Sequence, residues 1–135
     1  MKIVLDTNVL VSGILFSGPP HHILRAWSQG RLQLALTSEI LEEYRRVAIE
    51  LQDEYPTIDI AAALELVVVG SELFDPVPMV GGVCSDPDDD KFLACAIASG
   101  AHVVVSGDRH LLEVSGYRGI TVMKPRAFVE RHLRG

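Results

Sequence analysis

Residues 86–112 read DPDDDKFLACAIASGAHVVVSGDRHLL, and this stretch predicts a helix, a strand and a turn in succession. Asp88 or Asp89 is a good N-cap, because an aspartate side chain accepts hydrogen bonds from the free N–H groups of a first helical turn. Gly100 then closes the helix. The β-branched run that follows is typical of a buried strand, and it ends in a turn on Asp108.

The alternation of strand and helix continues outward from this stretch. Residues 2–6, KIVLD, form a short apolar run that ends on a carboxylate and turns into a helix. Further helices are expected at 21–29, 38–53, 58–74 and 109–113 and from Pro125 onward, further strands at 32–36 and 120–123, and an irregular loop at 75–88. The triplet 67–69 has some strand character. This order predicts an α/β fold, a three-layer α/β/α sandwich with a mostly parallel central sheet.

The composition limits the class of protein. The chain has 135 residues, a net charge of −6, and 48% hydrophobic and 22% charged residues, which is typical of one folded domain. The acidic total excludes a generally basic nucleic-acid-binding surface, but it does not exclude a nucleic-acid enzyme whose acidic site is neutralised by metal. No apolar run is long enough to span a membrane, no secretory signal is recognisable, and the two cysteines lack C-x-x-C spacing. We therefore expect a cytoplasmic protein.

Four acidic residues are predicted at strand ends or near helix starts. Asp6 ends the first strand, Glu43 lies about one turn into the 38–53 helix, Asp90 begins the helix after the aspartate run, and Asp108 ends the later strand. Ligands of open parallel sheets bind beyond the carboxyl ends of the strands, so these carboxylates can meet there. A hard cation such as Mg²⁺ or Mn²⁺ would relieve their mutual repulsion. Such an ion activates water and polarises a phosphoryl oxygen, which predicts hydrolysis of a phosphodiester.

Each of these acids also has a purely structural interpretation. Asp6 and Asp108 could only cap the helix or turn that follows them. Glu43 could lie on a solvated helix face, and the run Asp86–Asp90 could serve as helix cap and dipole complement. The prediction of a site comes from the agreement of two strand ends with one helix start.

Three segments of the chain together resemble the PIN-domain family. They are VLDTNVLVSGIL at 4–15, TSEILEEYRRV at 37–47, and the opening stretch at 86–112. The resemblance extends from residue 2 to about residue 130 and is closest to a small prokaryotic branch, the VapC-like ribonucleases described as toxins of toxin–antitoxin systems. The Asp-Thr-Asn and Ser-Gly-Asp motifs are its more specific parts. The resemblance implies a single PIN-like domain over residues 1–135.

The resemblance also implies roles for individual residues. The matching positions are Asp6, Glu43 (or Glu42), Asp90 and Asp108 as catalytic acids, with Asp6, Asp90 and Asp108 as metal ligands, and Thr7, Asn8 and Ser106 as supporting polar groups. Which of Asp86, Asp88 and Asp89 touches metal besides Asp90 stays open. Proteins of this kind are Mg²⁺- or Mn²⁺-dependent endoribonucleases that cut single-stranded or structured RNA. Many form homodimers inhibited by a small antitoxin.

Basic residues beside the acids are candidates for contacts with RNA phosphates or for ordinary surface ion pairs. They are Arg45, Arg46, Lys91 and Arg109. His110 follows Asp108 closely enough to touch a substrate, although a surface position is the simpler interpretation. The apolar stripe within 58–74 indicates either a helix contact with a second subunit or packing into the core.

Two other functions fit some of these features. Phosphotransfer on an aspartate, as in HAD-type phosphatases or receiver domains, also uses strand-end acids and Mg²⁺. HAD enzymes need a second aspartate two residues after the nucleophile, where this chain has Asn8, and Lys124 is only loosely placed for a receiver domain. A non-catalytic PIN module that binds RNA or protein is the third interpretation.

Overall fold

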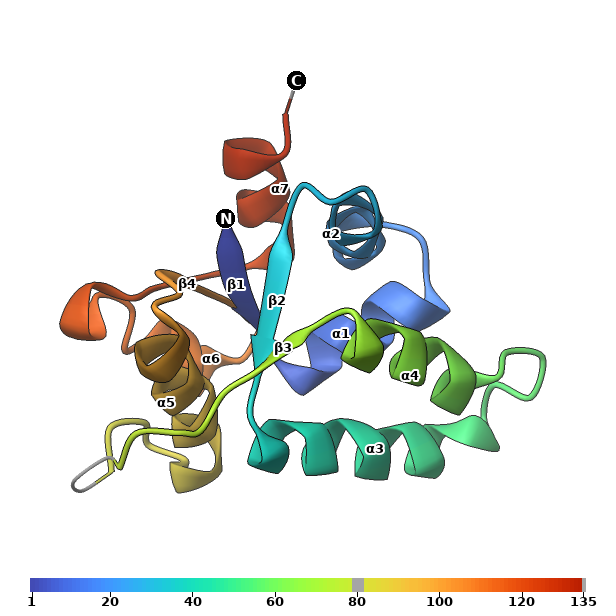
Figure 1. The fold of residues 1–135 in the computed structure, drawn as a ribbon, viewed down its shortest axis with the longest axis horizontal. Coiled ribbons are helices and arrows are strands. Elements are labelled where there is room, and N and C mark those ends of the chain that lie inside the picture. Colours follow the sequence, from blue (N-terminus) through green and yellow to red (C-terminus); the bar gives the residue numbers. More distant parts are fainter. Residues whose placement is uncertain (79–81, 135) are drawn as a thin grey trace.

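A parallel sheet forms the centre of the molecule. The structure is a computed structural model that describes residues 1–78 and 82–134. Within these residues, five strands pair in the order β3-β2-β1-β4-β5, all parallel (Figure 1). Their bounds are Lys2–Leu5 (β1), Gln33–Leu36 (β2), Glu72–Leu73 (β3), Val103–Val105 (β4) and Thr121–Met123 (β5). The predicted mostly parallel α/β sheet is confirmed.

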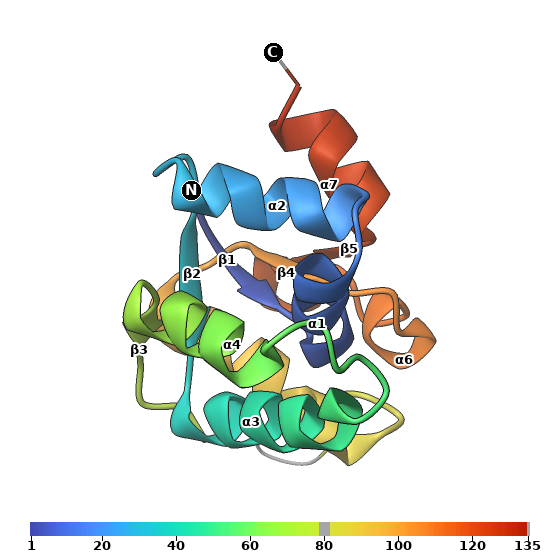
Figure 2. The same cartoon turned by 90° about the vertical axis from the view of Figure 1, so that its right-hand side faces the viewer.

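Helices cover both faces of this sheet. They are Thr7–Leu15 (α1), Pro19–Ser28 (α2), Ser38–Gln52 (α3), Ile60–Val69 (α4), Asp90–Ser99 (α5), Arg109–Leu112 (α6) and Pro125–His132 (α7), with short 3₁₀ turns at Pro87–Asp89 and Tyr117–Gly119. Helix α5 packs against β1, β2 and β4, whereas α1, α2 and α4 lie on the opposite side (Figure 1). Figure 2 shows α2 and α4 in front of the sheet, with α3 below α4. No described helix is long and apolar enough to cross a bilayer.

The apolar runs form central strands of the sheet because both faces of these strands are buried. Val103, Val104 and Val105 are all buried, as are Ile3 and Val4 in the neighbouring strand. Such near-continuous apolar runs are what a sheet covered on both sides requires. Phe92 of α5 and Phe128 of α7 are among the largest fully buried side chains.

Several element boundaries differ from the prediction. The expected 58–74 helix is wrong in extent, because α4 begins at Ile60 and ends at Val69, and residues 72–73 form the edge strand β3. Gly70 ends the helix against the ring of Trp27, where an added Cβ would come within 2.4 Å of Cζ2. The triplet 67–69 is helical. Part of the predicted loop, residues 79–81, lies outside the described residues.

The expected cap of α5 also differs. Asp86, not Asp88 or Asp89, accepts a hydrogen bond at the start of the segment, from the Asp88 N–H at 3.0 Å, and a 3₁₀ turn precedes the helix. The Asp89 side chain makes no capping bond. The consequence is that the Asp89 carboxylate is available for another role.

The sheet positions the site through the pairing of β1 with β4. Leu5 lies opposite Val105 in the parallel register, so the residues that follow both strands emerge side by side. The Asp6 N–H donates to the Val105 carbonyl at 3.0 Å, which extends this pairing by one step. Asp6 and Ser106 are therefore neighbours although 100 residues separate them in the sequence.

Candidate metal-binding active site

Asp6 is the buried acid at the centre of this edge. Its Oδ1 accepts a hydrogen bond from the Asn8 N–H at 2.9 Å, and its Oδ2 accepts one from the Ser106 hydroxyl. Burial raises the pKa of Asp6, the two hydrogen bonds oppose that rise, and the charges of Asp108 and Glu43 add to it. Asp6 therefore caps α1, as the structural interpretation predicted, and also faces other acids.

Asp108 is connected to Asp6 through Ser106. The fully buried Ser106 hydroxyl accepts a hydrogen bond from the Asp108 N–H at 2.9 Å and donates its own proton to Asp6. The Asp108 Oδ1 accepts from the His110 N–H at 2.7 Å, which begins α6. Ser106 thus fixes the spacing of the two strand-end acids.

Asp89 is the third acid of this group. Its Oδ2 is buried and has no hydrogen-bond partner among the described residues. Burial raises the pKa of Asp89 to about 6, with further increases from the charges of Asp108, Asp86 and Asp6 and a decrease from His110. An acceptor left without a donor, whose pKa is raised by burial and by other carboxylate charges, is in an environment that favours a bound cation.

The Asp90 carboxylate, predicted as a metal ligand from the sequence and the family resemblance, is bonded to the backbone in this structure. Both oxygens of its carboxylate face back to the preceding loop, where Oδ1 accepts from the Cys84 N–H at 2.7 Å and Oδ2 from the Val83 N–H at 3.2 Å. Asp89, one residue earlier, has an oxygen without such a partner. Asp90 stays a predicted ligand whose carboxylate is bonded to the backbone in this structure.

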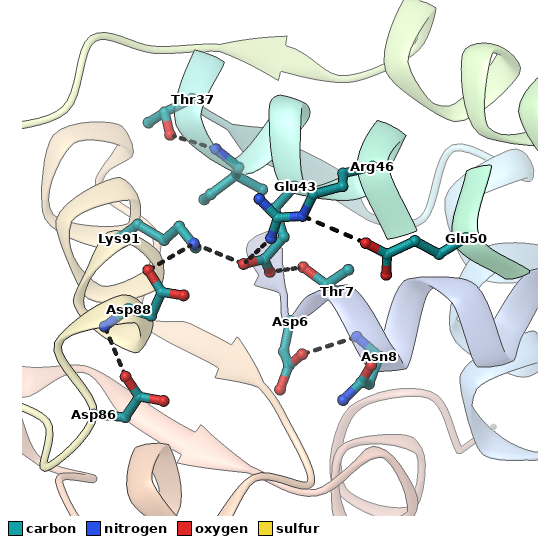
Figure 3. A network of polar contacts seen from close by, with 11 residues as sticks. Asp6, Thr7, Asn8, Thr37, Glu43, Arg46, Glu50, Asp86, Asp88 and Lys91 are labelled. Carbon is teal, nitrogen blue, oxygen red and sulfur yellow. Dashed lines mark hydrogen bonds and ion pairs between the residues drawn. The ribbon is translucent and has the colours of Figure 1, made fainter. Parts of the chain in front are cut away.

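Glu43 reaches the same edge from α3, but its carboxylate is already paired (Figure 3). Its Oε1 lies 2.7 Å from Lys91 Nζ and 3.7 Å from Arg46 Nη2, and its Oε2 accepts a hydrogen bond from the Thr7 hydroxyl. Glu42 is exposed to solvent. The glutamate that faces the site is therefore Glu43, which decides between the two predicted positions.

The four basic residues proposed for RNA contacts occupy different environments. Lys91 is buried, with 7% of its side chain exposed, and Arg45 makes a bidentate pair with Glu65 of α4 at 2.8 and 3.1 Å. Arg46 and Arg109 have 61% and 81% of their side chains exposed. Only these two combine a free surface with a position next to a site acid.

One pair of polar residues was not assigned a site role from the sequence. The Ser85 hydroxyl and the His110 Nδ1 are 2.6 Å apart, and the His110 charge acts on Asp89. The sequence signal is weak, since Ser85 only precedes the aspartate run and His110 only follows Asp108. Their contact joins the loop before α5 to the start of α6 at the border of the acidic group.

The acids fit an oxygen-ligated divalent ion in chemistry, although residues 1–78 and 82–134 contain no ready-made group of three or more His, Cys, Asp or Glu around one point. Mg²⁺ is usually held by one or two carboxylates, with water and substrate phosphate completing its shell. The unpartnered Asp89 oxygen and the raised pKa values of Asp6 and Asp89 are the features that an ion would relieve. The donor set contains hard oxygen ligands, which suit Mg²⁺ or Mn²⁺.

Comparison with known proteins agrees with this fold. A chain in the crystal structure of VapBC2 from Rickettsia felis bound to a DNA fragment from their promoter matches with a TM-score of 0.60 and 15% sequence identity, covering 92% of this chain and 98% of that chain. At this identity the match shows the fold alone. No curated protein sequence matches significantly. The family model described as PIN domain matches residues 2–110, and the chain therefore belongs to the PIN domain family.

Proposed function

We propose that this chain is a Mg²⁺- or Mn²⁺-dependent endoribonuclease that hydrolyses phosphodiester bonds in single-stranded or structured RNA. The observations that carry the proposal are Asp6 and Asp108 at adjacent strand ends, joined through the Ser106 hydroxyl, and the buried, unpartnered oxygen of Asp89. None of the three aspartates has an ion pair with lysine or arginine among the described residues. Membership of the PIN domain family supports the nuclease class.

The residues of the chain would divide the work as follows. Asp6 and Asp89 would hold the ion, with Asp108 binding it directly or through water, while Ser106 and Asn8 keep Asp6 in place. The bound ion would supply an activated water and a Lewis acid for the phosphoryl oxygen. Glu43, held by Thr7, completes the acidic site. Asp90 has a structural role in this proposal and holds the loop at 83–84.

RNA has to approach an acidic protein, and two exposed cations lie where its phosphates would pass. Arg46 is adjacent to Glu43 through an ion pair at 3.7 Å, and Arg109 follows Asp108 directly. Both carry exposed guanidinium groups that can pair with phosphate oxygens in two parallel hydrogen bonds. The proposed substrate path therefore crosses the sheet edge between α3 and α6.

We also propose that the chain acts as the toxin of a toxin–antitoxin pair. The support is the family resemblance together with the structural similarity to a chain of the VapBC2 complex. A small antitoxin encoded beside this chain would then inhibit its cleavage of RNA.

The first test is cleavage of a fluorescent single-stranded RNA by the purified chain with Mn²⁺. Asp6→Asn is expected to lower the cleavage rate about 100-fold or more, because a carboxylate at the reacting centre is lost. Asp53→Asn, an exposed aspartate after α3, is the matched control and should retain the wild-type rate. Circular dichroism confirms that each variant is folded.

Three outcomes would contradict the proposal. Cleavage that persists in a chelator and in Asp6→Asn would exclude a metal site at Asp6. Labelling of Asp6 by acetyl phosphate would support phosphotransfer instead. Tight binding of RNA without cleavage in any divalent ion would indicate a non-catalytic module.

A further inference from the structure

The acids at this edge of the sheet fall into two halves that differ in charge balance. In one half, the Glu43 carboxylate contacts the ammonium of Lys91 at 2.7 Å, and the Arg46 guanidinium lies 3.7 Å away (Figure 3). In the other half, Asp6, Asp89 and Asp108 have no ion pair with lysine or arginine among the described residues. Only the second half carries uncompensated negative charge.

Lys91 is a fixed part of the first half. It lies in the first turn of α5 and extends toward α3, and only 7% of its side chain is exposed (Figure 3). Its second anionic neighbour, Asp88, is 3.8 Å away and has an exposed side chain. A buried ammonium is retained where a carboxylate compensates it, because leaving either charge alone in the interior is costly. Lys91 and Glu43 therefore hold each other.

This pairing restricts where a divalent ion can bind. An ion coordinated by Glu43 would have to displace the ammonium or lie beside it, and two like charges at such a distance repel strongly in a site that is poor in water. The ion would meet no such repulsion at Asp6, Asp89 and Asp108. The Thr7 hydroxyl occupies the other Glu43 oxygen, which leaves that carboxylate with a donor on each side.

We propose that Lys91 is the resident cation of the Glu43 half, so that the site takes one divalent ion per chain, in the half formed by Asp6, Asp89 and Asp108. Lys91 is then a positioning residue, which acts by holding Glu43 and by excluding a second ion. The inference rests on the proposed nuclease function, since it assumes that the acidic site holds a divalent ion.

The test is a count of bound Mn²⁺ by electron paramagnetic resonance on the full chain, with free ion separated by equilibrium dialysis. The wild type is expected to bind one Mn²⁺. Lys91→Met keeps the apolar stem but removes the charge, and it should bind two, the second more weakly. Adding Glu43→Gln to Lys91→Met should restore a count of one. Arg109→Met, which also removes one positive charge beside a site acid, is the matched control and should bind one.

The possible results separate this inference from the proposed function. Two Mn²⁺ per wild-type chain, or one in a folded Lys91→Met variant, overturns the role of Lys91 and leaves the nuclease proposal standing. No bound Mn²⁺ together with no cleavage of RNA overturns both. If Lys91→Met does not fold, two Mn²⁺ on the wild-type chain still overturn the inference. The double variant Lys91→Met/Glu43→Gln, which removes both charges of the pair, must then bind one ion, and any other count also overturns the inference.

Discussion

Two adjacent aspartates at the start of α5 differ in whether hydrogen-bond donors compensate their negative charge. Asp90 accepts two backbone N–H groups, which satisfies its negative charge locally. Asp89 has a buried oxygen without a donor and other carboxylates nearby. Asp90 therefore stabilises the loop, whereas the unpartnered negative charge of Asp89 would be compensated by the divalent ion that we propose.

The raised pKa of Asp89 predicts a pH-dependent stability. The folded protein holds a proton at Asp89 up to about pH 6, whereas the unfolded chain loses it near 3.8, so this group destabilises the fold progressively as the pH rises from about 4 to about 6. Asp89→Asn removes that cost. In the absence of divalent ions we expect it to raise the free energy of unfolding by about 1–2 kcal/mol above pH 6, less than the full shift implies because water reaches part of the side chain.

Thermal unfolding in a chelator, at pH 7.5 and at pH 4, measures this effect. The Tm of Asp89→Asn should exceed that of the wild type at pH 7.5, and the difference should disappear at pH 4. Asp53→Asn serves as the control because Asp53 is an exposed acid outside the site. An equal or lower Tm for Asp89→Asn at pH 7.5 would contradict the placement of this carboxylate among other acids.

Substitution of Asp90 should lower the stability of the fold, in contrast to Asp89→Asn. Asp90→Ala leaves the N–H groups of Val83 and Cys84 without their acceptor, and Cys84 is buried. The expected loss is about 1–3 kcal/mol of unfolding free energy at neutral pH. Urea denaturation measures it as a lower midpoint with an unchanged slope. The idea fails if Asp90→Ala is as stable as the exposed-site variant Asp53→Ala.

The sequence predicted these acids well where the backbone alone directs them. Asp6 and Asp108 follow apolar strands, and the carboxyl ends of adjacent parallel strands must share an edge. The different hydrogen bonding of Asp89 and Asp90 could not be predicted, because it depends on a loop that folds back and supplies two N–H donors to Asp90. The Ser85–His110 contact likewise depends on the meeting of two loops that are 25 residues apart in sequence.

At the scale of elements, α1 begins at Thr7, directly after its capping residue Asp6, and is itself positioned by α2. The two helices are in close contact at Gly13, where an added Cβ would lie 2.8 Å from Leu24 Cδ1 and 2.9 Å from the carbonyl oxygen of Pro20. The leucine could move, but the Pro20 carbonyl belongs to the backbone of α2. Gly13 is thus the point that sets the distance between these helices.

Gly13→Ala tests this contact, and the expected change in unfolding free energy has the opposite sign to that of most glycine-to-alanine substitutions in helices. In an ordinary helix interior, replacing glycine by alanine stabilises by about 1 kcal/mol. Here the clash with the backbone is expected to outweigh that gain and to lower the unfolding free energy by about 1–3 kcal/mol. Thermal denaturation reports the change, and Gly107→Ala, where an added Cβ meets no atom within 4 Å, is the control. A more stable Gly13→Ala would mean that the helices can separate freely.

Prediction of the elements succeeded where periodicity and caps agree, and failed where packing decides. The helix predicted over 38–53 begins at Ser38, where the Thr37 side chain accepts a hydrogen bond from the Ile40 N–H at 3.4 Å. The end of α4 was missed because the apolar residues continue past Val69. Gly70 against Trp27 stops the helix there, and that contact joins residues 43 positions apart.

At the scale of the whole molecule, several large apolar side chains remain exposed among the described residues. Four of them lie on α3, α4 and β3, namely Ile49, Leu66, Val69 and Leu73. The exposed fractions are 72% for Leu66 and 84% for Val69, so the apolar stripe predicted within 58–74 is only partly used by the core. Exposed apolar side chains on neighbouring elements are candidates for a contact with another chain.

We expect a second copy of this chain to cover that surface, because a two-fold axis over α4 would pair the same apolar side chains with each other. The purified chain should then sediment at twice its mass of 14.7 kDa. Leu66→Lys with Val69→Lys places like charges on both sides of the axis and should give a monomer, whereas Gln29→Lys with His102→Lys, two exposed positions elsewhere, should not. A monomeric wild type at tens of micromolar would contradict the pairing, since burying about 800 Å² on each partner is ordinarily enough to hold a dimer together. In that case the dimer would have to be abandoned, whereas the contacts of Asp6, Asp89 and Asp108 would be unaffected.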